Sequence, residues 1–197
     1  MSKTGSRYHV AFRRRREGKT DFYRREGLLK SGKTRLAVRT TLSRIITQFI
    51  DAKPEGDRVI ASSTSRELAR DFGWKAGLGN QPAAYLAGLL AGLRAKANGL
   101  TEAIVDIGIK KPPAGSKIYA AVKGVKDSGV HVYCDESVLP SENRINGIHI
   151  AEYSKSFTHP EEKSYYFSEY RKKSLTPEEL PKHFAEVKIQ IVRSFKT

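Results

Sequence analysis

The chain has 197 residues, of which 36 are Lys or Arg and 21 are Asp or Glu, so its formal net charge is +15 at pH 7. A charge this high argues against a generic metabolic enzyme and is typical of proteins that bind nucleic acid. With 39% hydrophobic residues the chain can form a core, and its single cysteine excludes an internal disulfide or a cysteine zinc finger.

The positive charge is concentrated in the first 44 residues, which hold fourteen Lys and Arg against three acids, a net +11. Four consecutive arginines, Arg13 to Arg16, stand at the centre, among the aromatic residues Tyr8, His9, Phe12, Phe22 and Tyr23. Because like charges repel and resist collapse, we expect this segment to be largely disordered alone in water. A polyanion relieves the repulsion, since arginine binds phosphate and aromatic rings stack on unpaired bases. The pattern favours nucleic-acid binding over a solvated tail or a localisation signal.

Membrane binding is not predicted. The basic segment has no Leu- and Trp-rich face at helical spacing that could enter lipid. The N-terminus has no apolar stretch typical of a secretory signal, and the longest apolar run, 83–93, is too short to span a bilayer. We therefore expect a soluble intracellular protein without a membrane partner.

In chain order, residues 1–18 are predicted to be extended, and 21–30 to form a short basic helix with Asp21 as its N-cap. Short β-branched runs at 35–40, 44–50 and 57–63 predict three strands of an antiparallel meander. Arg35 and Arg39 bracket the first strand and Arg44 opens the second. One end or face of this sheet is therefore expected to be basic and continuous with the arm.

The middle of the chain alternates helices and strands. Residues 66–72 predict a short helix, 74–81 a glycine-rich loop, and 82–98 a helix with Pro82 at its first position. Small residues line one side of the long helix and predict close packing on the sheet: Ala84, Ala87, Gly88, Ala91 and Gly92. A buried strand at 103–107, a loop at 110–115, a helix capped by Ser116 and ending near 128, and a strand at 130–133 follow. The order β-β-β-α-β-α-β predicts an α/β fold with a mixed sheet covered by helices.

The pattern weakens after Asp135. Residues 143–153 are predicted to be helical in part, and 154–174, which are polar with little period, to form an appendage outside the core. Thr176 followed by Pro177 predicts the start of a terminal helix over 180–195. The chain thus divides into a basic arm (1–34), an α/β core (35–134) and a C-terminal extension (135–197).

Residues 27–34 match the P-loop pattern, and 103–106 resemble a strand that ends in a magnesium-binding Asp. A P-loop needs a buried strand before it and a helix after it, so that backbone N–H groups point at the phosphates. Here a charged helical segment precedes Gly27 and a strand pattern follows Thr34. A P-loop NTPase is therefore kept only as an alternative.

Other catalytic centres are weakly indicated. Cys134 lies beside Asp135 and Glu136, which disfavours a thiolate nucleophile and favours a buried structural thiol. Asp106 and these two acids could form the metal centre of an RNA-processing nuclease only if they converge, and Asp106 is more simply a loop or capping acid. No metal site is predicted, because the histidines show no ligand spacing: His9, His131, His149, His159 and His183. No cofactor or small-molecule substrate is predicted either.

Long strings of the sequence, in order along essentially the whole chain, resemble one known family. They are residues 13–23, 28–33, 79–94, 105–108, 115–117, 147–153 and 180–184. The chain closely resembles the 5S rRNA-binding protein of the large ribosomal subunit numbered eighteen in the universal scheme, in its archaeal and eukaryotic branch. The C-terminal extension points to the archaeal form, and residues 44–51 and 154–174 match the family pattern less tightly.

The resemblance implies a structural, non-enzymatic protein of the cytoplasmic ribosome that attaches 5S rRNA to the large rRNA in the central protuberance, beside neighbouring large-subunit proteins. We expect the arm to fold between rRNA segments, with loops 77–81 and 110–117 as secondary contacts. The candidate rRNA-binding residues are Arg7, Tyr8, Phe12, Arg13, Arg14, Arg15, Arg16, Lys19, Phe22, Tyr23, Arg24, Arg25, Lys30, Lys33, Arg35, Arg39, Arg44, Asn80, Lys111 and Lys117.

Overall fold

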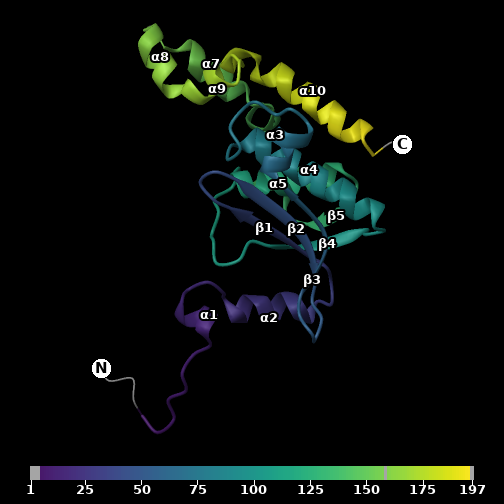
Figure 1. The fold of residues 1–197 in the computed structure, drawn as a ribbon. Coiled ribbons are helices and arrows are strands. Elements are labelled where there is room, and N and C mark those ends of the chain that lie inside the picture. Colours follow the sequence, from purple (N-terminus) through teal and green to yellow (C-terminus); the bar gives the residue numbers. More distant parts are fainter. Residues whose placement is uncertain (1–4, 158, 196–197) are drawn as a thin grey trace.

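The computed structural model describes residues 5–157 and 159–195, and its elements stack in layers (Figure 1). At one end lie the short helix α1 (Arg13–Arg16) and helix α2 (Phe22–Lys30), followed by a five-stranded sheet. Helices α4 (Gln81–Ala97) and α5 (Lys117–Asp127) cover the sheet, and the C-terminal helices form the last layer. The predicted α/β class, with a mixed sheet covered by helices, is confirmed.

The sheet has the strand order β3-β2-β1-β4-β5. Its strands are β1 (Arg35–Thr40), β2 (Ile45–Asp51), β3 (Arg58–Thr64), β4 (Glu102–Asp106) and β5 (His131–Tyr133). The first three form the predicted antiparallel meander, whereas β1 pairs with β4, and β4 with β5, in parallel. Side chains alternate between the faces of a strand, so Leu36 and Val38 enter the core under α4 and α5. Arg35 and Arg39 lie on the opposite, open face.

Helix α4 is the centre of the molecule. Asn80 caps it by accepting a hydrogen bond from Ala83 N at 3.0 Å, so Pro82 occupies the second helical position and not the first. The helix is apolar all round because it has neighbours on every side: the sheet and α5 on one side, and α3 (Ser65–Asp71) with the C-terminal helices on the other.

The small side of α4 was predicted to pack on the sheet, but its two glycines pack against helix α5. A Cβ added at Gly88 would lie 2.0 Å from the Ala121 carbonyl oxygen, and one at Gly92 2.1 Å from Ser128 Oγ. The prediction was correct for Ala84 and Ala91, which share a core with Leu36, Val38 and Phe49 of the sheet. The Ala87 carbonyl accepts a hydrogen bond from Ser63 of β3. The small side of α4 therefore packs against both the sheet and α5.

The C-terminal layer is more regular than the sequence indicated. Its helices are α6 (Glu142–Asn146), α7 (Ile148–Lys155), α8 (Pro160–Tyr166), α9 (Ser168–Lys172) and α10 (Leu180–Arg193), with 3-10 turns at Glu136–Val138 and Pro177–Glu179. The partly helical stretch 143–153 is confirmed. Residues 154–174, expected to be an appendage of little period outside the core, include α8 and α9, and Phe167 is buried there among other aromatic rings. Helix α10 covers a second core with Phe184 and Ile191.

The arm also departs from the expected extended chain. Arg13–Arg16 form one helical turn, and Glu17 offsets their repulsion by pairing with Arg13 at 3.2 Å and with Lys19 at 2.8 Å. Asp21 caps α2 as predicted, accepting from Arg24 N at 3.1 Å. Residues 1–4 of the predicted arm lie outside the described residues. Across residues 5–157 and 159–195, no helix combines the length and apolar composition needed to cross a membrane.

Candidate nucleic-acid interface

Helix α2 is fixed to the core by two of its arginines. Arg24 Nη1 donates to the Gly108 carbonyl oxygen at 3.3 Å, and Arg25 forms an ion pair with Asp57 at 2.8 Å. Gly108 follows strand β4 and Asp57 directly precedes β3, which lie on either side of β1 and β2 in the sheet. The helix is therefore anchored next to two separate strands. The basic segment is therefore docked on the core at α2.

Arg25 is the outer member of a chain of alternating charges. Arg35 donates to Asp57 at 2.8 Å and to Asp106 at 3.0 Å, and Arg39 pairs with the other oxygen of Asp106 at 2.9 Å. The Arg35 side chain is only 3% exposed. It was predicted to contact RNA, but its guanidinium is enclosed between two carboxylates and its role in the fold is structural.

The two acids in this network keep their charge. Burial alone would raise the pKa of the Asp106 carboxyl, but Arg39, the Gly108 N–H and Arg35 together hold that pKa below its ordinary value. Burial also raises the pKa of Asp57, and its hydrogen bonds from Arg25 and Arg35 outweigh this and lower it. Both carboxylates are thus ionised at neutral pH and committed to arginine.

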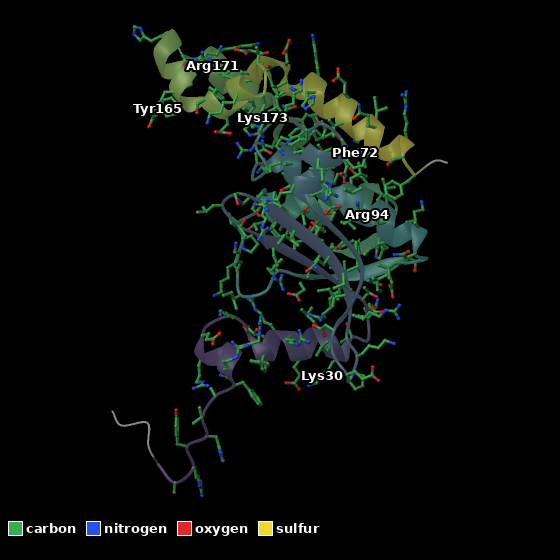
Figure 2. All side chains as sticks on the ribbon, in the orientation of Figure 1. Lys30, Phe72, Arg94, Tyr165, Arg171 and Lys173 are labelled. Atoms are coloured by element: carbon green, nitrogen blue, oxygen red, sulfur yellow. The ribbon has the colours of Figure 1, made fainter. Side chains whose placement is uncertain are left out.

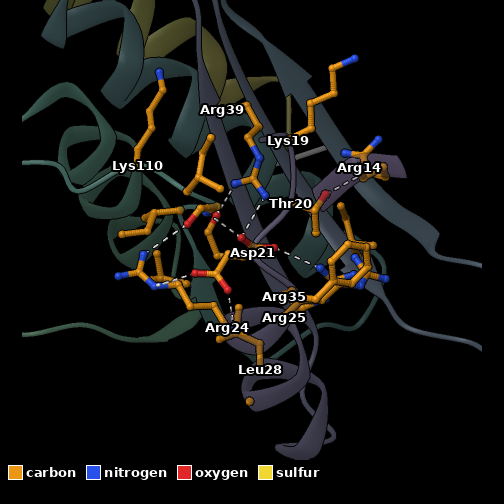
Figure 3. Close-up of a pocket in the computed structure, with 18 of the residues that line it drawn as sticks. Arg14, Lys19, Thr20, Asp21, Arg24, Arg25, Leu28, Arg35, Arg39 and Lys110 are labelled. Atoms are coloured by element: carbon orange, nitrogen blue, oxygen red, sulfur yellow. Dashed lines mark hydrogen bonds and ion pairs between the residues drawn. The ribbon is translucent and has the colours of Figure 1, made fainter. Parts of the chain in front are cut away.

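An open cleft of about 980 Å³ lies between the arm with α2 and the open face of the sheet (Figure 3). Several candidate residues line it, with the ion pairs described above at its base. The basic ones are Arg14, Lys19, Arg24, Arg25, Arg35, Arg39 and Lys110. The cleft therefore joins the arm and the sheet into one basic surface.

The rest of the arm presents cations and aromatic rings to solvent. Arg13, Lys19 and Lys30 are well exposed, and Lys30 projects from the end of α2 (Figure 2). The side chains of Phe12 and Tyr23 are 76% and 87% exposed. The arm's acids form only surface ion pairs, which contribute about 0–1 kcal/mol each, so phosphate can readily replace these acids as partners of the bases.

The remaining arm candidates differ in their surroundings. Arg7, Tyr8, Arg15 and Arg16 are exposed, and Arg14 Nε donates to Thr20 Oγ1 at 2.8 Å. The ring of Phe22 is half-buried, lies 5.5 Å from that of Phe12 and lines the cleft. The predicted stackers thus fall into two settings, with Phe12 and Tyr23 in solvent and Phe22 at the cleft.

The secondary candidates are mostly engaged in the fold. Asn80 caps α4, and Lys117 Nζ lies 3.4 Å from the Thr41 carbonyl oxygen and 3.3 Å from that of Gly79. Lys111 is exposed, and Arg44 at the β1–β2 turn is half-buried. Ser116 precedes α5 as predicted, but its hydroxyl makes no capping hydrogen bond.

The P-loop match does not fold as a P-loop. Its first four residues are the end of helix α2, and strand β1 follows it, the reverse of the strand-then-helix arrangement that binds phosphate. Lys33 Nζ lies 3.0 Å from Glu102 and 2.6 Å from the Tyr133 hydroxyl, and the Thr34 hydroxyl bonds to Asp51. The pKa of Lys33 is raised, first by the Tyr133 bond and then by Glu102. The lysine that would touch a nucleotide is therefore held by the sheet edge.

The nuclease alternative gains no support either. Asp106 is occupied by two arginines, and Asp135 accepts a hydrogen bond from Ser137 N at 2.9 Å. Within the part of the chain that the structure describes, no three His, Cys, Asp or Glu side chains converge as a metal site. Burial raises the pKa of the Cys134 thiol, which opposes a thiolate nucleophile.

Sequence reasoning missed the two acids that organise this surface. Asp57 was placed at a strand start. Asp106 does act as the predicted loop acid, accepting from Gly108 N at 2.9 Å, but the sequence did not show that the two acids together hold three arginines. They are 22 and 71 residues away from Arg35, so no local spacing reveals the pairing. The one available signal is that both acids flank strands predicted to share a sheet with Arg35.

Comparison with known proteins gives consistent matches. The family model described as ribosomal large subunit proteins 60S L5 and 50S L18 matches residues 6–99. A protein of Staphylothermus marinus named large ribosomal subunit protein uL18 is 47% identical over 98% of this chain and 96% of its own length. Proteins of the same name from Aeropyrum pernix and Caldivirga maquilingensis are 48% and 46% identical, over 82% and 99% of this chain and 75% and 95% of their own lengths.

Proposed function

We propose that this chain, which belongs to the archaeal type of the uL18 family of large-subunit ribosomal proteins, binds 5S rRNA and attaches it to the large rRNA in the central protuberance. The chain has a structural role in the ribosome. It works there without catalysis, as part of the cytoplasmic ribosome. Other large-subunit proteins adjoin it.

The observation that carries the proposal is the exposed set of cations and rings on an arm that is docked to a folded core. Phosphates neutralised by Lys and Arg release counterions and supply most of the affinity, and exposed rings can stack on unpaired bases. Because α2 is tied to the sheet through Arg25 and Asp57, RNA bound by the arm is held against the core. An arm fixed at one end can lie between two RNA segments and hold both.

The contact residues follow from exposure. The arm supplies the main contacts, with Arg39, Arg44 and Lys111 extending them toward the sheet and its loops. Arg35, Lys33, Asn80 and Lys117 are left out of the proposed contact set, because their polar groups are held by the fold. Arg24, Arg25 and Arg39 also have partners in the core, but they stay in the set because they line the open cleft with 34–45% of each side chain exposed. The proposed arm contacts are Arg7, Tyr8, Phe12, Arg13, Arg14, Arg15, Arg16, Lys19, Phe22, Tyr23, Arg24, Arg25 and Lys30.

A gel-shift titration on 5S rRNA at two salt concentrations tests the proposal. We expect the full chain to bind with an affinity that falls steeply with salt, by a log–log slope of about 0.7–0.9 for each phosphate contact. A chain lacking residues 1–20 should lose most of this affinity while its circular dichroism still reports a folded core. Binding no tighter than to an unrelated RNA of equal length would contradict the proposal.

A further inference from the structure

The cleft between α2 and the sheet has walls that are fixed relative to each other. The arm and α2 form one wall, and β1, the end of β4 and loop 107–110 form the other. Arg24 bridges them through the Gly108 carbonyl, and Arg25 through Asp57 (Figure 3). Its volume of about 980 Å³ corresponds to the space of on the order of 30 water molecules. These two contacts hold the walls together, so the docking of α2 on the core forms the cleft.

Part of the lining is apolar. Phe22 and Leu28 contribute from α2, Ile50 from β2 and Ile109 from the loop after β4. Ile109 is 54% exposed although it borders a concave surface. Covering such a surface is favourable by about 25 cal/mol per Å² of apolar area removed from water. Ligand sites of about 300–1,000 Å³ commonly combine such apolar walls with a few polar groups, so the cleft suits an occupant with an apolar surface.

Charge decides which kind of occupant fits. Asp57 and Asp106 are already neutralised by arginines at the base of the cleft. Arg14 and Lys110 come from opposite walls and donate to uncharged oxygens, Arg14 to the Thr20 hydroxyl at 2.8 Å and Lys110 to the Thr40 carbonyl at 2.7 Å. The rim of the cleft therefore carries positive charge that favours an anion.

We infer that the cleft receives one unpaired nucleotide of the bound RNA, with its base against the apolar lining that includes Phe22 and Ile109 and its phosphate at the basic rim to which Arg14 and Lys110 belong. An unpaired nucleotide joins a flat, largely apolar base to an anion, which matches the two parts of the lining. A duplex keeps its bases paired inside and cannot offer one to the cleft. An acidic peptide would satisfy the cations and leave the apolar wall uncovered.

This inference rests on the proposed function and gives one base of the bound RNA a specific place. A fluorescent probe in the cleft wall tests it. The variant Ile109→Trp puts an indole at the cleft, and Ile189→Trp puts one on α10, at the other end of the molecule, where the native side chain is 50% exposed. The natural Trp74 is 2% exposed and gives both variants the same background.

Each variant is titrated with 5S rRNA and, separately, with the large rRNA, while a gel shift on the same samples reports binding. We expect bound RNA to quench most of the added emission in Ile109→Trp and little of it in Ile189→Trp. The rRNA that quenches identifies the source of the nucleotide. Unchanged emission at 109 with RNA bound would overturn the inference and leave the proposed function standing. No binding by the unaltered chain would overturn both.

Three simpler probes separate the occupant's chemistry: a single-stranded oligonucleotide, a duplex of the same sequence, and poly-glutamate. We expect quenching of Ile109→Trp by the single strand at concentrations where the other two leave the emission unchanged. Quenching by poly-glutamate equal to that by RNA would overturn the inference in favour of an acidic peptide. Equal quenching by the duplex would also overturn it, because a duplex can touch the probe only from outside the cleft.

Substitutions at Phe22 provide a second readout, which depends on the ring alone. Phe22→Leu keeps an apolar side chain but removes the stacking surface, so we expect RNA affinity to fall about tenfold with an unchanged salt slope. Phe22→Tyr keeps the ring and should restore the affinity. The inference would be overturned by wild-type affinity in Phe22→Leu, or by weak binding in Phe22→Tyr despite a native circular-dichroism spectrum.

Discussion

A single arginine shows how far the role of a side chain depends on distant partners. Arg35 stands in a basic run, which is why the sequence predicts an RNA contact. In the fold its guanidinium is 3% exposed and lies between Asp57 and Asp106. A buried ion is stable only when paired, so the two acids are required by the position of Arg35 in the sheet. The same acids fix Arg25 of α2 and Arg39, and thereby connect two of the proposed RNA contacts to the core.

Removing one acid should therefore weaken the whole fold. Asp106→Asn keeps the size of the side chain but leaves Arg35 and Arg39 with less negative charge, and we expect a loss of about 3 kcal/mol in the free energy of unfolding at pH 7. Urea unfolding followed by circular dichroism measures it. Asp71→Asn, which breaks the exposed Arg70–Asp71 pair, is the control and should cost far less, because surface ion pairs add little to stability. Equal small losses in both variants would show that the network is not stabilising.

The same variant has a signature in acid. Because the pKa of Asp106 is lower in the folded chain than in the unfolded chain, its contribution is complete above the ordinary carboxyl pKa, near 4. The contribution is lost as the pH falls through the lowered folded pKa. Stability of the unaltered chain should thus decline below about pH 4 more steeply than that of Asp106→Asn. Parallel declines in urea midpoints between pH 5 and 2 would assign the acid sensitivity to other groups.

At the scale of elements, local patterns predicted what local forces determine. The strands at 35–40 and 57–63 and the helix capped by Asp21 follow from β-branched runs and a capping carboxylate, and they formed within one residue of prediction. Contacts between elements were less accessible. Nothing near Gly88 and Gly92 shows that their neighbour is α5, because that helix comes 25 residues or more later in the chain. The boundaries proposed at residues 34 and 134 remain predictions.

The crossing of α4 and α5 depends on the missing side chain of Gly88. A Cβ there would lie 2.0 Å from the Ala121 carbonyl oxygen, and both backbones are held in regular helices. We expect Gly88→Ala to lower the free energy of unfolding by about 3 kcal/mol, measured by urea denaturation. Gly27→Ala is the matched control, since Gly27 lies in α2 with no heavy atom near the added Cβ.

In the control, alanine should be neutral or stabilise by up to about 1 kcal/mol, because it favours helix. A Gly88→Ala chain as stable as the unaltered protein would mean that the two helices can separate without cost. The comparison therefore isolates close backbone approach from the ordinary effect of glycine in a helix.

Over the whole molecule, two ends with different chemistry are joined by α4. The N-terminal end carries most of the net charge and the cleft, whereas the C-terminal end buries its own core around Leu180 and Phe184 (Figure 1). Helix α9 nevertheless ends in Arg171 and Lys172, and Lys173 follows as its C-cap, so three consecutive bases lie at that far end (Figure 2). These allow location to be tested separately from net charge.

Two triple variants each lower the formal net charge by three. Replacing Arg13, Arg15 and Arg16 with Gln removes arm cations, and replacing Arg171, Lys172 and Lys173 with Gln removes the α9 cluster. We expect the arm variant to lose about 0.7–0.9 of the log–log salt slope of RNA binding per phosphate contact removed, or about 2–3 in total. The α9 variant should keep the slope of the unaltered chain, because its cations lie beyond α4 from the arm.

Equal losses in gel-shift titrations across several salt concentrations would mean either that RNA also reaches the C-terminal layer or that net charge alone sets the affinity. A duplex of unrelated sequence separates these outcomes, since a pure net-charge effect would weaken its binding to both variants alike.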